Sequence, residues 1–164
     1  FCMGRFVMQY KNSIRYLHKY ITNKSMINNM NKNSVCIFAE SGEYVKFHNL
    51  LSISMAAIVN DMEVNIFFSY SALERLKKDN INNTVFNDDN LKKKFIKSIN
   101  SKKIQNIEQM IKTLKETELV KFYACSASLS IMEIEMDELF AIDGIMGLST
   151  FLNKVEKASI VLYI

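Results

Sequence analysis

Residues 34–69, SVCIFAESGEYVKFHNLLSISMAAIVNDMEVNIFFS, contain the pattern that decides the fold. Two short runs rich in β-branched and aromatic residues, 35–39 and 63–69, predict buried strands. Between them, residues 44–60 carry apolar side chains at helical spacing and predict a helix with a wide apolar face. A strand, a helix and a second strand in this order predict a βαβ unit whose two strands are parallel.

The remainder of the chain continues this alternation. Ser71 begins a short predicted helix, with Glu74 placed for a reciprocal capping box. Residues 79–103 are polar and rich in Asn and Lys, and they predict a long surface excursion with room for one helical turn. After it we expect a helix at 104–114, a strand at 120–125 and mixed short helices at 126–140. A helix that contains Gly147 should follow at 143–155, and a last strand at 159–164. The sequence therefore predicts an α/β fold: a doubly wound, mostly parallel sheet of about five strands with helices on both faces.

Length and composition place the chain among ordinary globular proteins. It has 164 residues, of which 49% are hydrophobic and 23% charged, unlike a disordered chain. No window approaches the roughly 18 uninterrupted apolar residues that a membrane-spanning helix needs. The three cysteines are widely spaced and form no CxxC pair. This usage disfavours a disulfide framework or a cysteine-rich zinc site and favours a reducing, cytoplasmic environment.

Charge divides the chain into two parts. Residues 1–33, here called the leader, carry six basic side chains and no acidic one, whereas the rest has fifteen basic and seventeen acidic residues. The nearly neutral remainder lacks the positive field that nucleic-acid binding needs. The leader has apolar residues at helical spacing: Phe6, Tyr10, Ile14, Leu17 and Ile21.

The leader therefore predicts a basic amphipathic helix and an Asn-rich linker, followed by a domain at 34–164. Three interpretations of the helix remain open. It packs on the domain or on a neighbouring subunit, it attaches to a membrane surface or targets an organelle, or it is sequence upstream of the folded protein.

Cys125 is the main candidate for chemistry. In doubly wound sheets, ligands bind beyond the carboxyl ends of the strands, and Cys125 is the last residue of a predicted strand. A helical segment begins directly after it, and the free N–H groups of a helix start stabilise a thiolate. The alternative is a buried structural cysteine, which is common in protein interiors. Cys36, in the middle of the first strand, is assigned to the core, and Cys2 in the leader is left unassigned.

Residues that follow the predicted strands are candidates to line a site at the carboxyl edge of the sheet, together with Cys125. These are Ser41, Gly42, Tyr44, His48, Tyr70, Ser126 and Ser128. A single helical histidine such as His48 is more often structural than catalytic. Ser41-Gly42 is too short for a dinucleotide or Walker loop, and no spacing of His, Asp or Glu predicts a metal site. The acidic residues within 133–138 are interpreted as a solvated helix face.

Residues 34–164 resemble the DsrE/DsrF-like family. The resemblance lies in Ser41-Gly42-Glu43-Tyr44 followed by Lys46-Phe47-His48, in VKFYACSASLSIMEIEMDEL from Val120, and in DGIMGLSTFL from Asp143 before a terminal apolar strand. In the similar branch of the family the segment after the cysteine usually reads Cys-x-Met-Ser-Met, then a pair of residues and Met-Gly. This chain departs from that pattern at Ala127, Leu129 and Glu133.

The resemblance implies a small sulfur-relay or sulfurtransferase protein. Its strand-end cysteine, here Cys125, would accept sulfane sulfur as a persulfide or thiosulfonate and pass it to a partner such as a TusA-like carrier. His48 matches a position at which the branch often has His, so it would line the site. The family also implies homo- or hetero-oligomers, commonly trimers, tetramers or hexamers, and some members are called peroxiredoxin-like. This sulfur chemistry requires no metal and no organic cofactor.

Three functions remain open at this point. The first is sulfur transfer through Cys125. The second is a peroxide-reducing or redox-sensing protein that uses the same thiol, which requires a resolving thiol that the sequence does not visibly supply. The third is a non-catalytic subunit of a sulfur-relay complex, in which Cys125 is buried.

Overall fold

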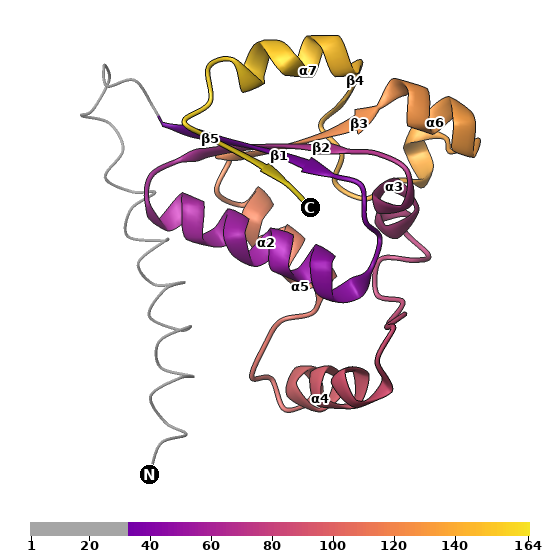
Figure 1. Ribbon diagram of the computed structural model, residues 1–164. Coiled ribbons are helices and arrows are strands. Elements are labelled where there is room, and N and C mark those ends of the chain that lie inside the picture. The colour runs from indigo at the N-terminus through magenta and orange to yellow at the C-terminus, as the bar shows by residue number, and fades with distance from the viewer. Residues whose placement is uncertain (1–32) are drawn as a thin grey trace. The chain divides into compact units, whose positions relative to one another are not determined.

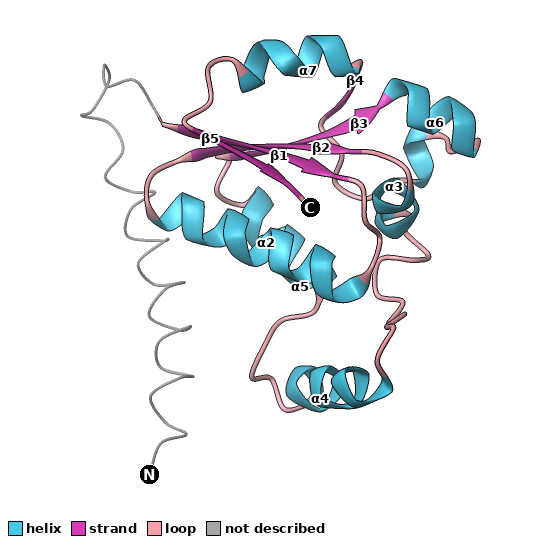
Figure 2. Cartoon of the chain, in the orientation of Figure 1, coloured by secondary structure: helices cyan, strands magenta, loops and turns pink. Residues whose placement is uncertain are grey.

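The computed structural model describes residues 33–164, so the predictions for the leader helix lie outside the described residues. The described part contains a five-stranded sheet in which all strand pairs are parallel (Figures 1 and 2). Its strands are β1 (Ser34–Ala39), β2 (Glu63–Phe68), β3 (Val120–Cys125), β4 (Gly144–Met146) and β5 (Ile160–Tyr163). They lie in the order β4-β3-β2-β1-β5, which confirms the predicted doubly wound α/β fold.

Helices cover both faces of this sheet. Helices α2 (Tyr44–Val59) and α5 (Ile107–Lys115) pack together on one face, and α7 (Leu148–Val155) lies on the other (Figure 1). At the carboxyl ends of the strands lie α3 (Ser71–Leu76) and α6 (Ser126–Met132), with the short 3₁₀ helix η1 (Met136–Glu138) following α6. Helix α4 (Asp89–Asn100) lies in the excursion between α3 and α5. No helix of residues 33–164 combines the length and apolarity needed to cross a bilayer.

Strand alternation builds two apolar layers. Phe68 of β2 stacks on Phe47 of α2 with ring centroids 5.6 Å apart, so alternate strand residues face α2 and α5. The intervening residues face α7, where Phe67 stacks on the fully buried Phe151 at 4.9 Å. Burying a side chain of this size contributes about 1.5–3 kcal/mol, so Phe151 holds α7 on the sheet.

The predicted capping box at Ser71 is wrong. The N-cap of α3 is Tyr70, at φ 45° and ψ −124°, and it makes no side-chain capping bond. The Ser71 hydroxyl instead donates to the Glu40 carbonyl at 2.7 Å and accepts the Gly42 N–H at 2.9 Å. A tertiary contact with the loop after β1 therefore takes the hydroxyl that a local cap would have used.

The single helix predicted over 143–155 is also wrong. Its first part forms the edge strand β4, and Gly147 is the N-cap of α7 rather than a helical residue. The free edge of β3 supplies backbone partners that override the local helical pattern. The Asp143 carboxylate fixes the start of β4, because it accepts the Phe122 N–H at 2.6 Å and pairs with Lys115.

The excursion contains more helix than the single turn we predicted. The Asp88 carboxylate caps α4 by accepting the Asn90 and Leu91 N–H groups at 2.7 and 3.1 Å. None of the α4 side chains is fully buried. The helix is held by Phe95, whose ring packs against Tyr44 and His48 of α2.

Candidate functional site

Cys125 lies at the carboxyl end of β3, between the ends of β2 and β4. It pairs in register with Met146 of β4 and is the N-cap residue of α6. Its side chain points into the layer beneath α7, next to Phe67 and Phe151, and is only 8% exposed. The thiol is therefore not presented openly to solvent, and in its burial it matches the structural alternative considered for this cysteine. Strand alternation directs the side chain toward the face that α7 covers.

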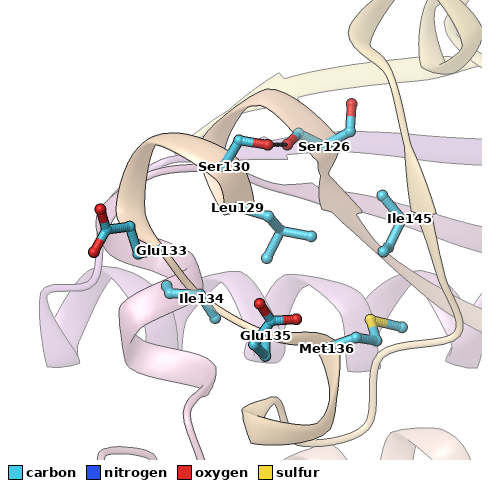
Figure 3. A pocket seen from close by; sticks show the side chains of 8 residues that line it. All are labelled: Ser126, Leu129, Ser130, Glu133, Ile134, Glu135, Met136 and Ile145. Atoms are coloured by element: carbon cyan, nitrogen blue, oxygen red, sulfur yellow. Dashed lines mark hydrogen bonds between the residues drawn. The ribbon is translucent and has the colours of Figure 1, made fainter.

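A cavity of about 510 Å³ lies along α6, the helix that follows Cys125 (Figure 3). Ser126, the next residue, lines it, as does Ile145, the neighbour of the register partner Met146. Leu129 and Ile134 also contribute apolar surface. Cys125 does not line this cavity: its side chain and that of Met146 point into the layer under α7, whereas strand alternation directs Ile145 to the other face of the sheet.

Two carboxylates belong to this cavity. Glu133 and Glu135 line it, and none of its lining residues is basic. The prediction of solvated acidic residues is confirmed for Glu133 and Glu135, which are exposed, but they do not share a helix face, because α6 ends at Met132 and a short 3₁₀ helix follows.

Glu133 has an unusual backbone conformation. It ends α6 at φ 53° and ψ 43°, in the left-handed region that favours glycine. The Ile134 N–H donates to the Leu129 carbonyl at 3.1 Å and closes the turn. The left-handed conformation costs a non-glycine residue about 1 kcal/mol.

Ser41 and Gly42 lie in the loop between β1 and α2. An ideal Cβ at Gly42 would stand 2.3 Å from the Ser71 carbonyl oxygen, so only glycine allows this close approach. Together with the hydrogen bonds of Ser71, this contact joins the loop after β1 to the turn after β2. Tyr70, in that turn, is 52% exposed.

Arg75 was not predicted as a functional or structural residue. It is only 7% exposed, although an arginine in a short amphipathic helix looks like a surface residue. Its Nε donates to the Gly42 carbonyl at 2.8 Å, and its Nη1 donates to the carbonyls of Asn80 and Asn83. The guanidinium also lies 5.8 Å from the centre of the Tyr44 ring. Arg75 therefore links the loop after β1 to the start of the excursion.

Tyr44 and His48 are not brought to Cys125. Both belong to an aromatic cluster with Phe86 and Phe95, on the face of the sheet opposite to the Cys125 side chain. Tyr44 is fully buried. Of the other candidates, Ser126 lines the cavity and Ser128 is buried in α6.

Burial lowers the pKa of His48, although its hydrogen bond to the Gln105 carbonyl opposes the shift. Because the folded protein takes up this proton at lower pH than the unfolded chain, the free energy of unfolding should fall as pH drops below about 6.5. His48→Gln should remove this part of the pH dependence. Urea unfolding at about pH 7.5 and about pH 5.5 measures it, and an equal pH dependence in variant and wild type would contradict the assignment.

Cys36 and Cys125 are too far apart to form a disulfide in this fold. Cys36 is level with Asn65, and Asn65 is level with Lys121, four residues before Cys125. This offset is about 13 Å along the strands, in addition to two strand spacings of about 4.8 Å, whereas disulfides need Cα atoms within about 7 Å. Among residues 33–164 no group of three or more His, Cys, Asp or Glu side chains is placed to hold a metal ion.

Comparisons with known proteins agree with this architecture. Two solved structures share the fold at low sequence identity: the protein of unknown function MTH1491 from Methanobacterium thermoautotrophicum, and the ychN protein from E. coli. The first is 13% identical with a TM-score of 0.53, and the match covers 81% of this chain and 98% of that one. The second is 17% identical with a TM-score of 0.56, over 80% of this chain and 99% of that one.

No curated protein matches the chain in sequence. The model of the DsrE/DsrF-like family, however, matches residues 33–164, which include every strand described above. The chain therefore belongs to the DsrE/DsrF-like family.

Proposed function

We propose that this protein is a sulfur-relay protein that accepts sulfane sulfur on Cys125 and passes it to a partner thiol. The observation that carries the proposal is the position of Cys125 as the last residue of β3 and the N-cap of α6, at the carboxyl edge of the sheet. Family membership supports the same chemistry. A TusA-like carrier is the proposed partner, and a reducing, cytoplasmic compartment would keep the thiol free.

The transfer needs no external oxidant. The Cys125 thiolate attacks the outer sulfur of a donor persulfide, the donor's S–S bond breaks, and its electron pair leaves with the donor's inner sulfur as a thiolate. A new S–S bond forms at Cys125, and the proton on the outer sulfur stays with it. Attack by an acceptor thiolate on that outer sulfur reverses the process and regenerates the Cys125 thiolate.

Access to the buried thiol would come from β4. This edge strand has only three residues, is paired on one side to β3 alone, and contains Met146, which packs against the cluster that holds Cys125. Short edge elements with few buried contacts open at the lowest free energy. Displacement of β4 on partner or donor binding would expose Cys125 without disturbing the central strands.

The peroxide-reducing alternative lacks support in the described residues. It needs a resolving thiol, and Cys36 is out of reach of Cys125 in the same chain. A resolving thiol would have to come from the leader or from another molecule.

Exposed apolar residues support the proposal that the protein is a homo-oligomer. Leu148 and Leu152 on α7 are 53% and 49% exposed, and Val161 and Tyr163 on the edge strand β5 are also exposed. Exposed apolar side chains on a helix and on an edge strand are typical of surfaces that another subunit covers.

Incubation of the full chain with cysteine persulfide should add the mass of one sulfur atom to the intact protein, and dithiothreitol should remove it. Digestion and mass spectrometry of the peptides should place that sulfur on Cys125. Slow alkylation of Cys125 in the native protein, together with no loading by any donor, would instead support the non-catalytic subunit.

A further inference from the structure

We infer that two copies of this chain pair through the open edge of β5, antiparallel and around a twofold axis, so that their sheets join into one. The inference rests on the homo-oligomer in the proposed function and names the surface that forms it. Three features of β5 and its surroundings carry it: a free backbone edge, an uncharged apolar face and two exposed leucines of α7.

The outer backbone edge of β5 has no partner strand in the described part of the chain, because β5 pairs with β1 alone (Figure 1). Directly after β5, the Ile164 N–H donates to the Phe38 carbonyl at 2.8 Å, and the Ile164 carbonyl accepts the Glu40 N–H at 3.0 Å. Successive residues of a strand direct their backbone groups to opposite sides. The N–H and C=O groups of Val161 and Tyr163 therefore point to the open edge, where a strand of another molecule can pair with them.

The face of β5 beside this edge is apolar and exposed. The Tyr163 ring lies 6.5 Å from that of Phe38, which packs in the layer beneath α7, so Tyr163 and Val161 lie on the α7 side of β5. They are 68% and 46% exposed. Residues 160–163 carry none of the charges or prolines that keep an edge strand from pairing. An exposed apolar face at an open sheet edge is typical of a surface that another chain covers.

Two exposed leucines of α7 continue this face. Phe151 points from α7 to the sheet, and Lys154, three residues later, lies over the Tyr123 ring of β3 at 5.2 Å from its centre. At about 100° per residue, Leu148 and Leu152 lie on the opposite flank of the helix, which is the flank toward β1 and β5. They are 53% and 49% exposed. These leucines and the exposed residues of β5 form one surface, here called the α7–β5 surface: Leu148, Leu152, Val161 and Tyr163.

A second copy fits the α7–β5 surface because this surface is complementary to itself. When Leu162 lies opposite Leu162 of the second copy, Val161 pairs with Tyr163 of that copy, and its Val161 pairs with Tyr163 here. This register pairs all the outward N–H and C=O groups of these residues. Opposed residues share a face, so both pairs of a β-branched and an aromatic side chain stack on the α7 side, between the leucines of the two α7 helices. No charge enters the interface.

A twofold interface requires an even number of copies. Of the assemblies that the family resemblance implies, it allows the tetramer and the hexamer and excludes the trimer. Size-exclusion chromatography with light scattering on the full chain should therefore give the mass of an even number of copies.

Val161→Lys tests the surface by the same measurement. The substitution places a charge beside Tyr163 of the second copy and should raise the dissociation constant of the pair at least about tenfold, which lowers the mass at a given concentration. Ile145→Lys is the matched control, because Ile145 is a 52% exposed apolar residue of β4, at the other edge of the sheet. Its mass should equal that of the wild type. An equal change in both variants, or none in Val161→Lys, contradicts the inference.

Leu162→Cys and Ile160→Cys test the register, each combined with Cys2→Ser so that the leader thiol forms no cross-link. In the inferred pair the two Cα atoms at position 162 are about 4.5 Å apart, within the range of a disulfide. Those at position 160 are offset by four residues, or about 14 Å, which is out of range. Oxidation with diamide should therefore cross-link Leu162→Cys at least about tenfold faster than Ile160→Cys, as measured on a non-reducing gel.

The outcomes separate this inference from the relay. A wild type with an odd number of copies, or equal cross-linking of the two cysteine variants, overturns this inference alone, because assembly would then use another surface. A monomeric wild type overturns it together with the proposed homo-oligomer. Failure of sulfur loading on Cys125 in a protein that pairs as described overturns the relay and leaves this inference in place.

Discussion

Cys125→Ser should lose sulfur loading by at least about 100-fold, to the level of the background reaction. The serine hydroxyl is not ionised near neutral pH and does not form a stable bond with sulfane sulfur, so both halves of the relay fail. The substitution is nearly isosteric, and the side chain retains slight solvent contact, so the fold should remain intact. Intact mass after incubation with cysteine persulfide gives the loading, and circular dichroism gives the folded fraction.

Cys36→Ala is the matched control for this result. Cys36 is fully buried in the same layer of the core but lies in the middle of β1, away from the carboxyl edge. Its loss should leave a small gap and reduce stability while sulfur loading continues. If Cys125→Ser still takes up one sulfur atom and Cys36→Ala does not, the relay site is not the one proposed.

Arg75→Met should lower the free energy of unfolding by about 3 kcal/mol, the largest effect on stability that we expect from one polar residue. The guanidinium satisfies the carbonyls of Gly42, Asn80 and Asn83 at once, and methionine leaves all three without this donor. Removing one partner of a buried charged hydrogen-bond network costs several kcal/mol. Urea unfolding followed by circular dichroism measures the change.

Lys93→Met is the control for Arg75. Lys93 is an exposed cation on α4, and its replacement should change stability by less than about 0.5 kcal/mol. Arg75→Lys keeps the charge but cannot reach three carbonyls with one ammonium group, so it should lie between the wild type and Arg75→Met. A loss below about 1 kcal/mol for Arg75→Met would mean that water replaces the arginine in this network.

The central strands were predictable because the residues within each strand are sufficient to indicate it. Residues 120–125 form β3 as predicted, since a short apolar run flanked by polar residues has few alternatives in a buried sheet. Edge strand β4 was not predictable, because Gly144–Met146 become a strand only when the edge of β3 is available to pair. Likewise, the local sequence around Ser71 predicts a helix cap, because it carries no information that the loop containing Gly42 lies beside it.

The position of Cys125 at the end of β3 was predictable, but the exposure of its side chain was not. The strand pattern placed Cys125 at the carboxyl edge, yet whether α7 covers its side chain depends on where the chain after β4 crosses the sheet. The structural roles of Arg75 and Glu133 were not predicted, for a related reason. Each is a charged residue in a short helix or at its end, where the sequence pattern predicts only solvent contact.

The register offset between Cys36 and Cys125 determines how many sulfur atoms the proposed relay would carry at a time. Because no second thiol of residues 33–164 reaches Cys125, this part of the chain would hold one transferable sulfur atom at a time. Discharge to a thiol of another molecule would then be bimolecular, with a rate that rises in proportion to acceptor concentration, and titration with donor would end at one sulfur atom on residues 33–164. Assembly into an oligomer would multiply the capacity of the particle without changing that ratio.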